Sequence, residues 1–188
     1  MKHGIKFLLV LLAMFAQISA YAQPKKASPR TEGDGPYNQL IIRGVTIINS
    51  TGAPPLGPAD IVVENNRIAS IRVVGSPGLP INEARRPKLA AGGKELNAQG
   101  MYLMPGFIDM HAHIGGAEKG SDADYVFKLW LAHGVTTVRE PGSMNGLDWV
   151  LDQKNKSIKN EIIAPRIYAY TVFGQGSKTP ITTGEQAR

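Results

Sequence analysis

Three ionisable side chains stand at alternate positions in one short stretch of the chain. Residues 105–115 read P-G-F-I-D-M-H-A-H-I-G, which spaces Asp109, His111 and His113 two residues apart. The whole chain has only four histidines. On a β-strand, side chains two residues apart point to the same face, so this spacing directs the three groups together. Two neutral imidazoles on one face can bind one metal ion through their ring nitrogens.

A His-x-His pair alone is a weak indication of a metal site, because paired histidines can also be satisfied by backbone carbonyls. The surrounding sequence favours the metal hypothesis. A Pro-Gly turn and an apolar run precede the pair, and Gly115 and Gly116 follow it, where the absence of side chains lets backbone approach a ligand closely. Asp109 is expected to orient a histidine from outside the ligand set or to hold the loop.

Other polar residues near the predicted strand ends carry weaker hypotheses. Arg139 ends the run V-T-T-V-R, where it could bind a substrate carboxylate or form a structural ion pair with Glu140 or another neighbour. His133 falls in the last turn of a predicted helix, where a cation interacts favourably with the helix dipole. Tyr168 and Tyr170 share a strand face, and core packing is the expected role of both.

From Pro105 onward, predicted strands and helices alternate. The strands are predicted at 107–111, 135–139 and 166–173, the helices at 121–133 and 147–157, and a third helix starts with a capping box at 182–185. This rhythm is typical of parallel βα units, whose active sites lie at the carboxyl ends of the strands. Three such units are too few to close a barrel of eight.

The preceding part of the chain, residues 38–104, predicts a small and mostly antiparallel β domain. Strands are expected at 40–49, 60–64, 67–73, 94–98 and 101–104. Asn65-Asn66 predicts a two-residue hairpin turn, because asparagine tolerates positive φ. The last two strands are expected to pair with each other around Gln99-Gly100. Residues 75–93 are expected to form a long irregular insertion.

The N-terminus has the layout of a secretory signal peptide over residues 1–22. Lys2, His3 and Lys6 precede a ten-residue apolar stretch, and Ala20-Tyr21-Ala22 is a small-x-small cleavage pattern. An uncleaved anchor is the alternative, but a span needs roughly 20 apolar residues. We therefore expect export to the periplasm or the medium and no stable membrane span after cleavage. Residues 23–37 are polar and predict a flexible leader.

Composition excludes several classes of function. The 188 residues are 43% hydrophobic, enough for a core. The net charge is +6, but no basic stripe is interleaved with aromatic residues, so nucleic-acid binding is not expected. The chain has no cysteine, which excludes disulfides, thiolate ligands and a cysteine nucleophile.

Three stretches together resemble a known family. P-G-F-I-D-M-H-A-H resembles the first-strand motif of the amidohydrolase superfamily, in particular its imidazolonepropionase- and prolidase-like branch. H-G-V-T-T-V-R-E-P-G (133–142) resembles that family's second strand. Q-L-I-I-R-G-V-T-I-I-N and D-I-V-V-E-N-N-R-I-A-S-I resemble its N-terminal β-sandwich. The resemblance covers about residues 38–188.

The resemblance implies an α/β protein: an incomplete (β/α)₈ TIM-type barrel of about three βα units from residue 105 to 188, preceded by a small β-sandwich over 38–104. It implies that His111 and His113 bind one or two divalent cations, zinc being the usual choice, and that metal-activated water attacks a C–N bond. The substrate would be a small molecule or short peptide with an amide, cyclic amide or peptide bond.

The family completes its site with residues from later strands, so no catalytic residue is assigned within these 188 residues. Glu140 also stands where the family commonly has aspartate. The leading hypothesis is the N-terminal part of an exported metal-dependent amidohydrolase, with the 188 residues alone expected to bind metal weakly and to be inactive. The alternatives are a truncated, inactive fragment and a non-catalytic exported binding module. The sequence fixes neither the substrate, the metal nor the oligomeric state.

Overall fold

The computed structural model describes residues 25–115, 121–170, 172 and 181–186. The predicted signal peptide therefore lies outside the described residues. Two compact units make up the described chain. One unit runs from Glu32 to Gly106, and the other combines the segment ending at Thr31 with the residues from Phe107 onward. Within the described part of the chain, no helix is long and apolar enough to cross a membrane.

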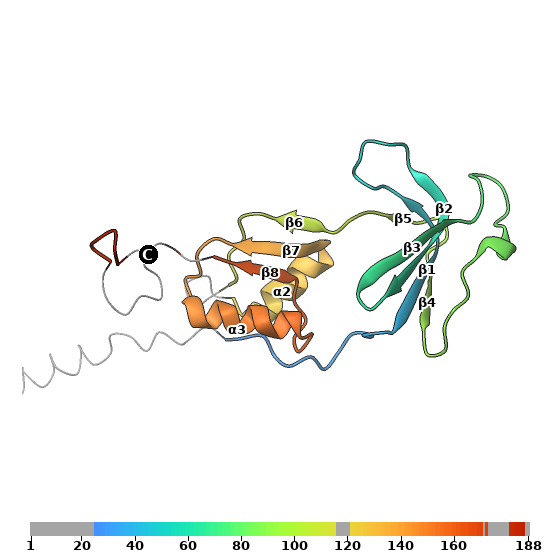
Figure 1. The fold of residues 1–188 in the computed structure, drawn as a ribbon. Helices are drawn as coiled ribbons and strands as arrows, with labels where there is room; N and C mark the ends of the chain where they lie inside the picture. The colour runs from blue at the N-terminus through green and yellow to red at the C-terminus, as the bar shows by residue number, and fades with distance from the viewer. Residues whose placement is uncertain (1–24, 116–120, 171, 173–180, 187–188) are drawn as a thin grey trace, which may run out of the picture. The chain divides into compact units, whose positions relative to one another are not determined.

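The Glu32–Gly106 unit is built on a single five-stranded sheet (Figure 1). Its strands are β1 (Gln39–Ile47), β2 (Leu56–Glu64), β3 (Arg67–Val73), β4 (Lys94–Asn97) and β5 (Tyr102–Leu103), and a short 3₁₀ turn, η1 (Glu83–Arg85), lies between β3 and β4. The strand order is β3-β2-β1-β4, with β5 also paired to β1. The described strands of residues 38–104 thus form one sheet.

Local turn chemistry sets the pairing of the first three strands. Asn65 and Asn66 both have positive φ, as the predicted hairpin turn requires, and β2 pairs antiparallel with β3. The alternation in β3 is irregular because the register shifts between Val62 and Val63. The predicted pairing of the last two strands was wrong: β4 and β5 each run parallel to β1.

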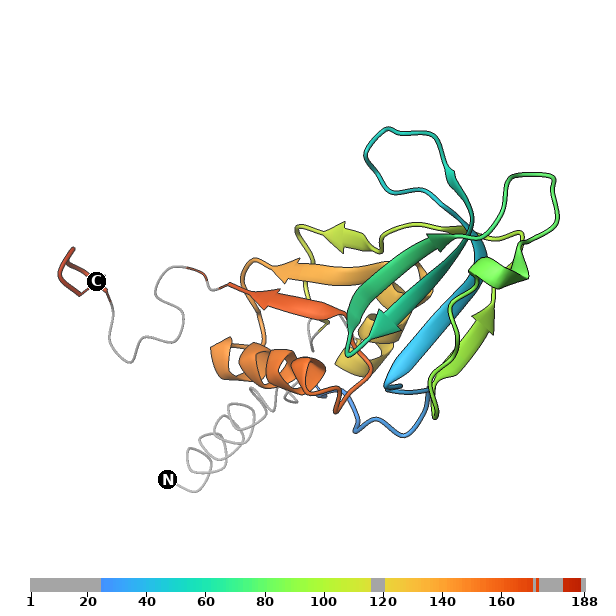
Figure 2. The same cartoon turned by 45° about the vertical axis from the view of Figure 1, so that its right-hand side comes forward.

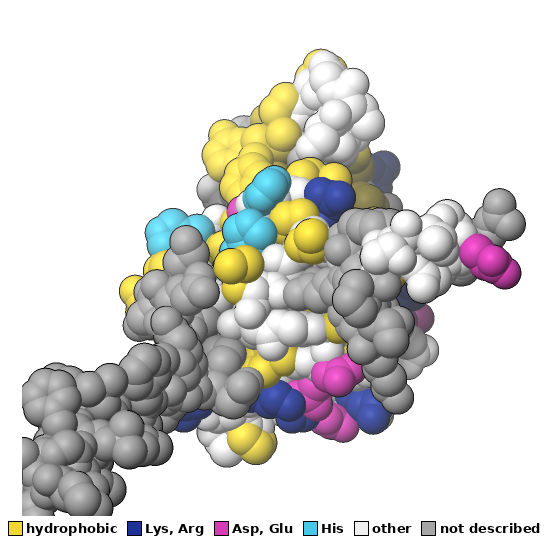
Figure 3. All heavy atoms as spheres, turned by 90° about the vertical axis from the view of Figure 1, so that its left-hand side faces the viewer, with side chains coloured by type: hydrophobic (Ala, Val, Ile, Leu, Met, Phe, Trp, Pro, Cys, Tyr) yellow, Lys and Arg dark blue, Asp and Glu magenta, His cyan; other side chains and the backbone are white. Residues whose placement is uncertain are grey.

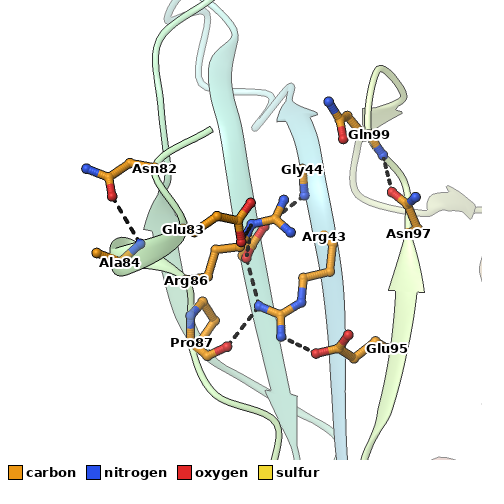
Figure 4. A network of polar contacts seen from close by, with 11 residues as sticks. Arg43, Gly44, Asn82, Glu83, Ala84, Arg86, Pro87, Glu95, Asn97 and Gln99 are labelled. Atoms are coloured by element: carbon orange, nitrogen blue, oxygen red, sulfur yellow. Dashed lines mark hydrogen bonds and ion pairs between the residues drawn. The ribbon is translucent and has the colours of Figure 1, made fainter. Parts of the chain in front are cut away.

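A cluster of charges crosses this sheet (Figure 4). Arg43 on β1 donates from Nη1 to Asp60 on β2 at 2.9 Å and to the Pro87 carbonyl at 2.8 Å, and its Nη2 pairs with Glu95 on β4. Asp60 is 0% exposed, and its second oxygen accepts from the Gly44 amide at 2.8 Å. Burial alone would lower the pKa of Arg43, but the hydrogen bonds to Glu95 and Asp60 outweigh it and raise that pKa. This cluster joins three strands to the loop before β4.

The second unit is a parallel sheet covered by two helices on one side (Figures 1 and 2). Its elements are β6 (Phe107–Asp109), α2 (Ala123–Ala132), β7 (Val135–Glu140), α3 (Leu147–Ile158) and β8 (Arg166–Ala169). The strand order is β6-β7-β8, all parallel. Each helix connects two neighbouring strands, which is the βα rhythm that the sequence predicts. The core between helices and sheet includes Phe127, Val138, Trp149, Val150 and Ile167.

Three details of this unit differ from the prediction. The first strand ends at Asp109 and is exposed rather than buried, because it lies at the edge of the sheet. The residue before α2 that takes the cap position is Asp122, not Ser121. Near the end of the chain, Thr183 and Gln186 exchange side-chain to backbone hydrogen bonds, so the capping box begins one residue later than predicted; these residues form a turn.

An extended segment, residues 25–31, packs against the helices of this unit, although the sequence placed it in a flexible leader. Ala27 is buried and its amide donates to Oε1 of Gln153, a fully buried residue of α3, at 2.9 Å. The Arg30 amide donates to the Glu161 carbonyl at 2.7 Å. Asp152 pairs with Lys26 at 3.0 Å. We call residues 25–31 the strap.

The charge cluster of the first sheet leads to a stability prediction. Asp60→Ala leaves Arg43 with one partner fewer and the Gly44 amide without its acceptor, so we expect the free energy of unfolding in urea to fall by about 3–5 kcal/mol. Glu83→Ala is the matched control, because Glu83 is an exposed acid 3.7 Å from Arg86 and should change the same quantity by less than about 1 kcal/mol. If both variants lowered the free energy of unfolding equally, the buried contacts of Asp60 would contribute no more to stability than those of an exposed acid.

The strap leads to a second prediction, which is tested by the rate at which trypsin cleaves after Lys25, Lys26 and Arg30. Gln153→Leu removes the buried acceptor of the Ala27 amide, a loss of about 1–3 kcal/mol, and should therefore speed cleavage in the strap by about tenfold. Asn155→Leu changes an exposed residue of the same helix and should leave cleavage unchanged. Equal cleavage of wild type and Gln153→Leu would contradict the docking of the strap through Gln153.

Candidate metal site

The two histidines lie just beyond the end of β6, not on the strand where the sequence placed them. The segment that carries them still alternates: Ala112 and Ile114 are buried in the core, while His111 and His113 are exposed. The Ala112 amide donates to the backbone carbonyl of Arg139 on β7 at 3.0 Å, which holds the segment beside the sheet. Burial of the two apolar side chains therefore turns both imidazoles outward, away from the core.

The imidazole rings of His111 and His113 are neighbours. Their centroids are 5.1 Å apart and their planes meet at 85°. A zinc ion bonded at about 2.0–2.1 Å to one nitrogen of each ring, in a tetrahedral arrangement, places two ring centroids roughly 5 Å apart. The observed separation therefore fits two ligands of one cation. Figure 3 views the ends toward which the strands of this unit run, and it shows histidine side chains exposed there beside hydrophobic ones.

A buried carboxylate holds one of the two rings. Glu140, the last residue of β7, is 1% exposed, and its Oε1 lies 2.8 Å from Nδ1 of His113. Its Oε2 accepts from the Ile114 amide at 2.7 Å, and Oε1 also accepts from the Gly142 amide at 3.3 Å. Three donors thus surround a carboxylate that would be costly to bury alone.

This contact sets the tautomer of His113. An ionised carboxylate offers only acceptors, so the ring nitrogen that faces it carries the proton. The other nitrogen, Nε2, then has a lone pair in the neutral ring. Metal-binding histidines commonly donate their second ring N–H to a carboxylate in this way. The His113–Glu140 pair therefore has the arrangement of a metal ligand and its supporting acid.

Asp109 has a local role in the structure. Its Oδ1 accepts from the His111 amide at 3.0 Å, a bond to the backbone two residues ahead that is typical of aspartate in turns. This bond turns the chain at the end of β6 and fixes the start of the histidine segment. The Asp109 side chain thus supports the loop that leads to His111.

Gly115 allows the chain to turn directly after His113. Its φ is +39°, and a Cβ at this position would lie 2.7 Å from the Ser121 carbonyl oxygen. Asn145 supports the same turn, since its amide donates to the Ile114 carbonyl at 2.9 Å. Any larger residue at position 115 would therefore displace the backbone next to the histidine pair.

The remaining candidate residues lie apart from the histidine pair or face a different way. His133 ends α2, where its Nδ1 lies 2.8 Å from the Leu129 carbonyl. Arg139 makes no ion pair with Glu140; its Nη1 donates to the Met110 carbonyl at 3.3 Å. Tyr170, expected in the core, is exposed and lies against the Arg139 guanidinium, 4.5 Å from Cζ to the ring centroid.

The contact between Glu140 and His113 was not predicted from the sequence. Glu140 was expected only as a possible partner of Arg139 and as a departure from the family pattern. A signal was present: β6 and β7 are consecutive parallel strands, so an acid at the end of the second lies level with residues that follow the first. Within the described residues, no group of three or more histidine, cysteine, aspartate or glutamate side chains is placed to hold a metal. The described site thus offers two imidazoles.

Comparison with known proteins relates this chain to enzymes of one superfamily. It is 32% identical over 129 residues to adenine deaminase 2 of Rhizobium etli, a match that covers 66% of this chain and 19% of that protein. It is 35% identical over 85 residues to 5-methylthioadenosine/S-adenosylhomocysteine deaminase of Caldicellulosiruptor saccharolyticus, covering 45% and 18%. The chain thus spans about a fifth of these relatives. No family model matches.

Solved structures share the mixed α/β fold. A putative prolidase from Bifidobacterium longum superposes with a TM-score of 0.57 at 24% identity, covering 78% of this chain and 34% of that one. A prolidase complexed with N-methylphosphonate-L-proline gives 0.52 at 20%, covering 71% and 32%. These likenesses establish the fold. Over the part of its relatives that the chain spans, the sequence matches and the structural neighbours point to the amidohydrolase superfamily.

Proposed function

We propose that this chain contributes the first metal ligands to an exported, metal-dependent amidohydrolase that hydrolyses a C–N bond. The bond is an amide, a cyclic amide or a peptide bond in a small molecule or short peptide. Relatives with these chemistries support the proposal, among them adenine deaminases, a deacetylase and a dihydropyrimidinase. The predicted signal peptide supports export to the periplasm or the medium.

The contact between His113 and Glu140 carries this proposal. A structural histidine at a surface needs no buried acid. Here the acid holds the proton on Nδ1 and leaves Nε2 without a carboxylate partner, and the His113 side chain is 42% exposed. Such a fixed, neutral and accessible imidazole is suited to bind a metal.

His111 and His113 would hold a divalent cation, with zinc as our first choice because imidazole nitrogens suit it. When bound, the cation supplies Lewis acidity at the scissile carbonyl and activates water. The chain's own residues do the positioning. Glu140 orients His113 and keeps its proton on Nδ1, and Asp109 holds the turn before His111. Burial of Ala112 and Ile114 keeps both imidazoles on one side.

The parallel order β6-β7-β8, with a helix between successive strands, supports an incomplete (β/α)₈ barrel in which these are the first three strands. The histidine pair follows the carboxyl end of β6 and Glu140 ends β7, the edge at which barrel enzymes carry their active sites. In this proposal later strands supply the remaining ligands and the catalytic acid or base. One or two cations fit such a site.

Zinc titration followed by calorimetry tests the proposal. We expect the wild-type chain to bind zinc weakly, with two protein ligands, and His111→Ala and His113→Ala each to reduce the affinity by about tenfold or more. Glu140→Gln should also weaken binding by about tenfold, since the amide can donate to Nδ1 and no longer selects the right tautomer.

His133→Ala is the matched control, because it removes an imidazole that contacts the Leu129 carbonyl at the end of α2 and is not part of the proposed site. Its zinc affinity should equal that of the wild type. Zinc binding that survives loss of both His111 and His113, or that depends equally on His133, would contradict the proposed site. Hydrolysis is not expected of these 188 residues alone, because in this proposal later strands supply the remaining ligands and the catalytic acid or base.

A further inference from the structure

Arg139 precedes Glu140 on β7 and points to the opposite face of the strand, as successive residues do. Its guanidinium lies against the ring of Tyr170, with Cζ 4.5 Å from the ring centroid. Its Nη1 also donates to the Met110 carbonyl at 3.3 Å. Contacts from the segment before His111 and from the residue after β8 therefore hold this side chain in place.

The charge of Arg139 has no acidic partner among the residues that the structure describes. The other described ion pairs of this unit use lysines or His113, and Glu140 is occupied with His113 and two backbone amides. A guanidinium has five N–H donors and stays charged, and only one donor of Arg139 is used in a described hydrogen bond. Its remaining donors are available to an anion.

The Arg139 guanidinium is connected to the segment that carries the histidine pair. Met110, whose carbonyl accepts from the guanidinium, is the residue before His111. The backbone carbonyl of Arg139 accepts from Ala112, the residue between the two histidines. Arg139 is therefore attached to the same short segment that presents both imidazoles, at the same end of the sheet.

We infer that Arg139 binds a carboxylate of the substrate, and that Tyr170 positions the guanidinium for it. The inference rests on the proposed function for the reacting bond, and it narrows the substrate to N-acyl amino acids or dipeptides. One guanidinium matches the single charge of a carboxylate, and its planar donors suit two carboxylate oxygens. A phosphate dianion would call for further donors.

Binding of two matched probes, followed by NMR in the metal-free chain, tests the inference. N-acetyl-L-proline carries the carboxylate, and N-acetyl-L-prolinamide is its neutral counterpart. The wild type should prefer the acid, and Arg139→Gln should lose about tenfold in affinity for the acid with no change for the amide. Arg139→Lys should lose less, because it keeps the charge without the planar fork. Tyr170→Leu should lose about two- to fivefold for the acid only.

Arg166→Gln is the control, since it removes the same charge at the opposite end of β8 and should leave both affinities unchanged. Equal wild-type affinities for the two probes, or an equal loss with Arg166→Gln, would overturn the inference. Tighter, Arg139-dependent binding of glucosamine 6-phosphate would overturn the choice of carboxylate. Zinc titration separates the two proposals: Arg139→Gln should keep the zinc affinity that His111→Ala loses. A wild-type chain that binds zinc through His111 and His113 but does not prefer the acid probe would refute only the role of Arg139.

Discussion

A single buried carboxylate organises the end of the parallel sheet. Glu140 is 1% exposed, and His113 and two backbone amides satisfy its buried oxygens. The same three contacts tie the end of β7 to the segment after β6 and set the proton on one ring nitrogen. The histidine pair, the turn at Gly115 and the neighbouring guanidinium all depend on this connection between two strand ends.

The rest of the unit can be understood as support for that connection. Ala112 and Ile114 anchor the segment in the core beneath α2 and α3, and their burial directs the two imidazoles outward. The helices are in turn bound by the strap through the buried amide of Gln153. Stability and site geometry are thus linked: loss of a buried contact behind the sheet would loosen the backbone that presents the histidines.

Much of this could be predicted from the sequence, because the signals were local. The parallel βα rhythm, the hairpin at Asn65-Asn66 and the pairing of His111 with His113 follow from periodicity, turn chemistry and spacing. The imidazoles do share a side, but the reason is burial of Ala112 and Ile114, not a continuing strand. The parallel pairing of β4 and β5 with β1 was missed, since nothing local distinguishes it from a hairpin.

Contacts between distant residues were the hardest to predict. Glu140 and His113 are far apart in the sequence, as are Ala27 and Gln153, and neither pair has a signature in its own neighbourhood. Arg139 was considered as a partner for Glu140, but adjacent residues on a strand face opposite ways, so that ion pair was sterically disfavoured from the start. The resemblance to a known family predicted His111 and His113 as ligands, but it did not predict that Glu140 orients His113.

The central claim is that Glu140 holds His113 as the Nδ1–H tautomer and leaves Nε2 to a metal. Long-range ¹⁵N–¹H NMR of the histidine rings, recorded before and after addition of zinc, measures this directly. We expect Nδ1 of His113 to be protonated under both conditions. Zinc should change the ¹⁵N chemical shift only of Nε2 in His113 and of one ring nitrogen in His111. A protonated Nε2, or zinc that shifts Nδ1 of His113, would contradict it.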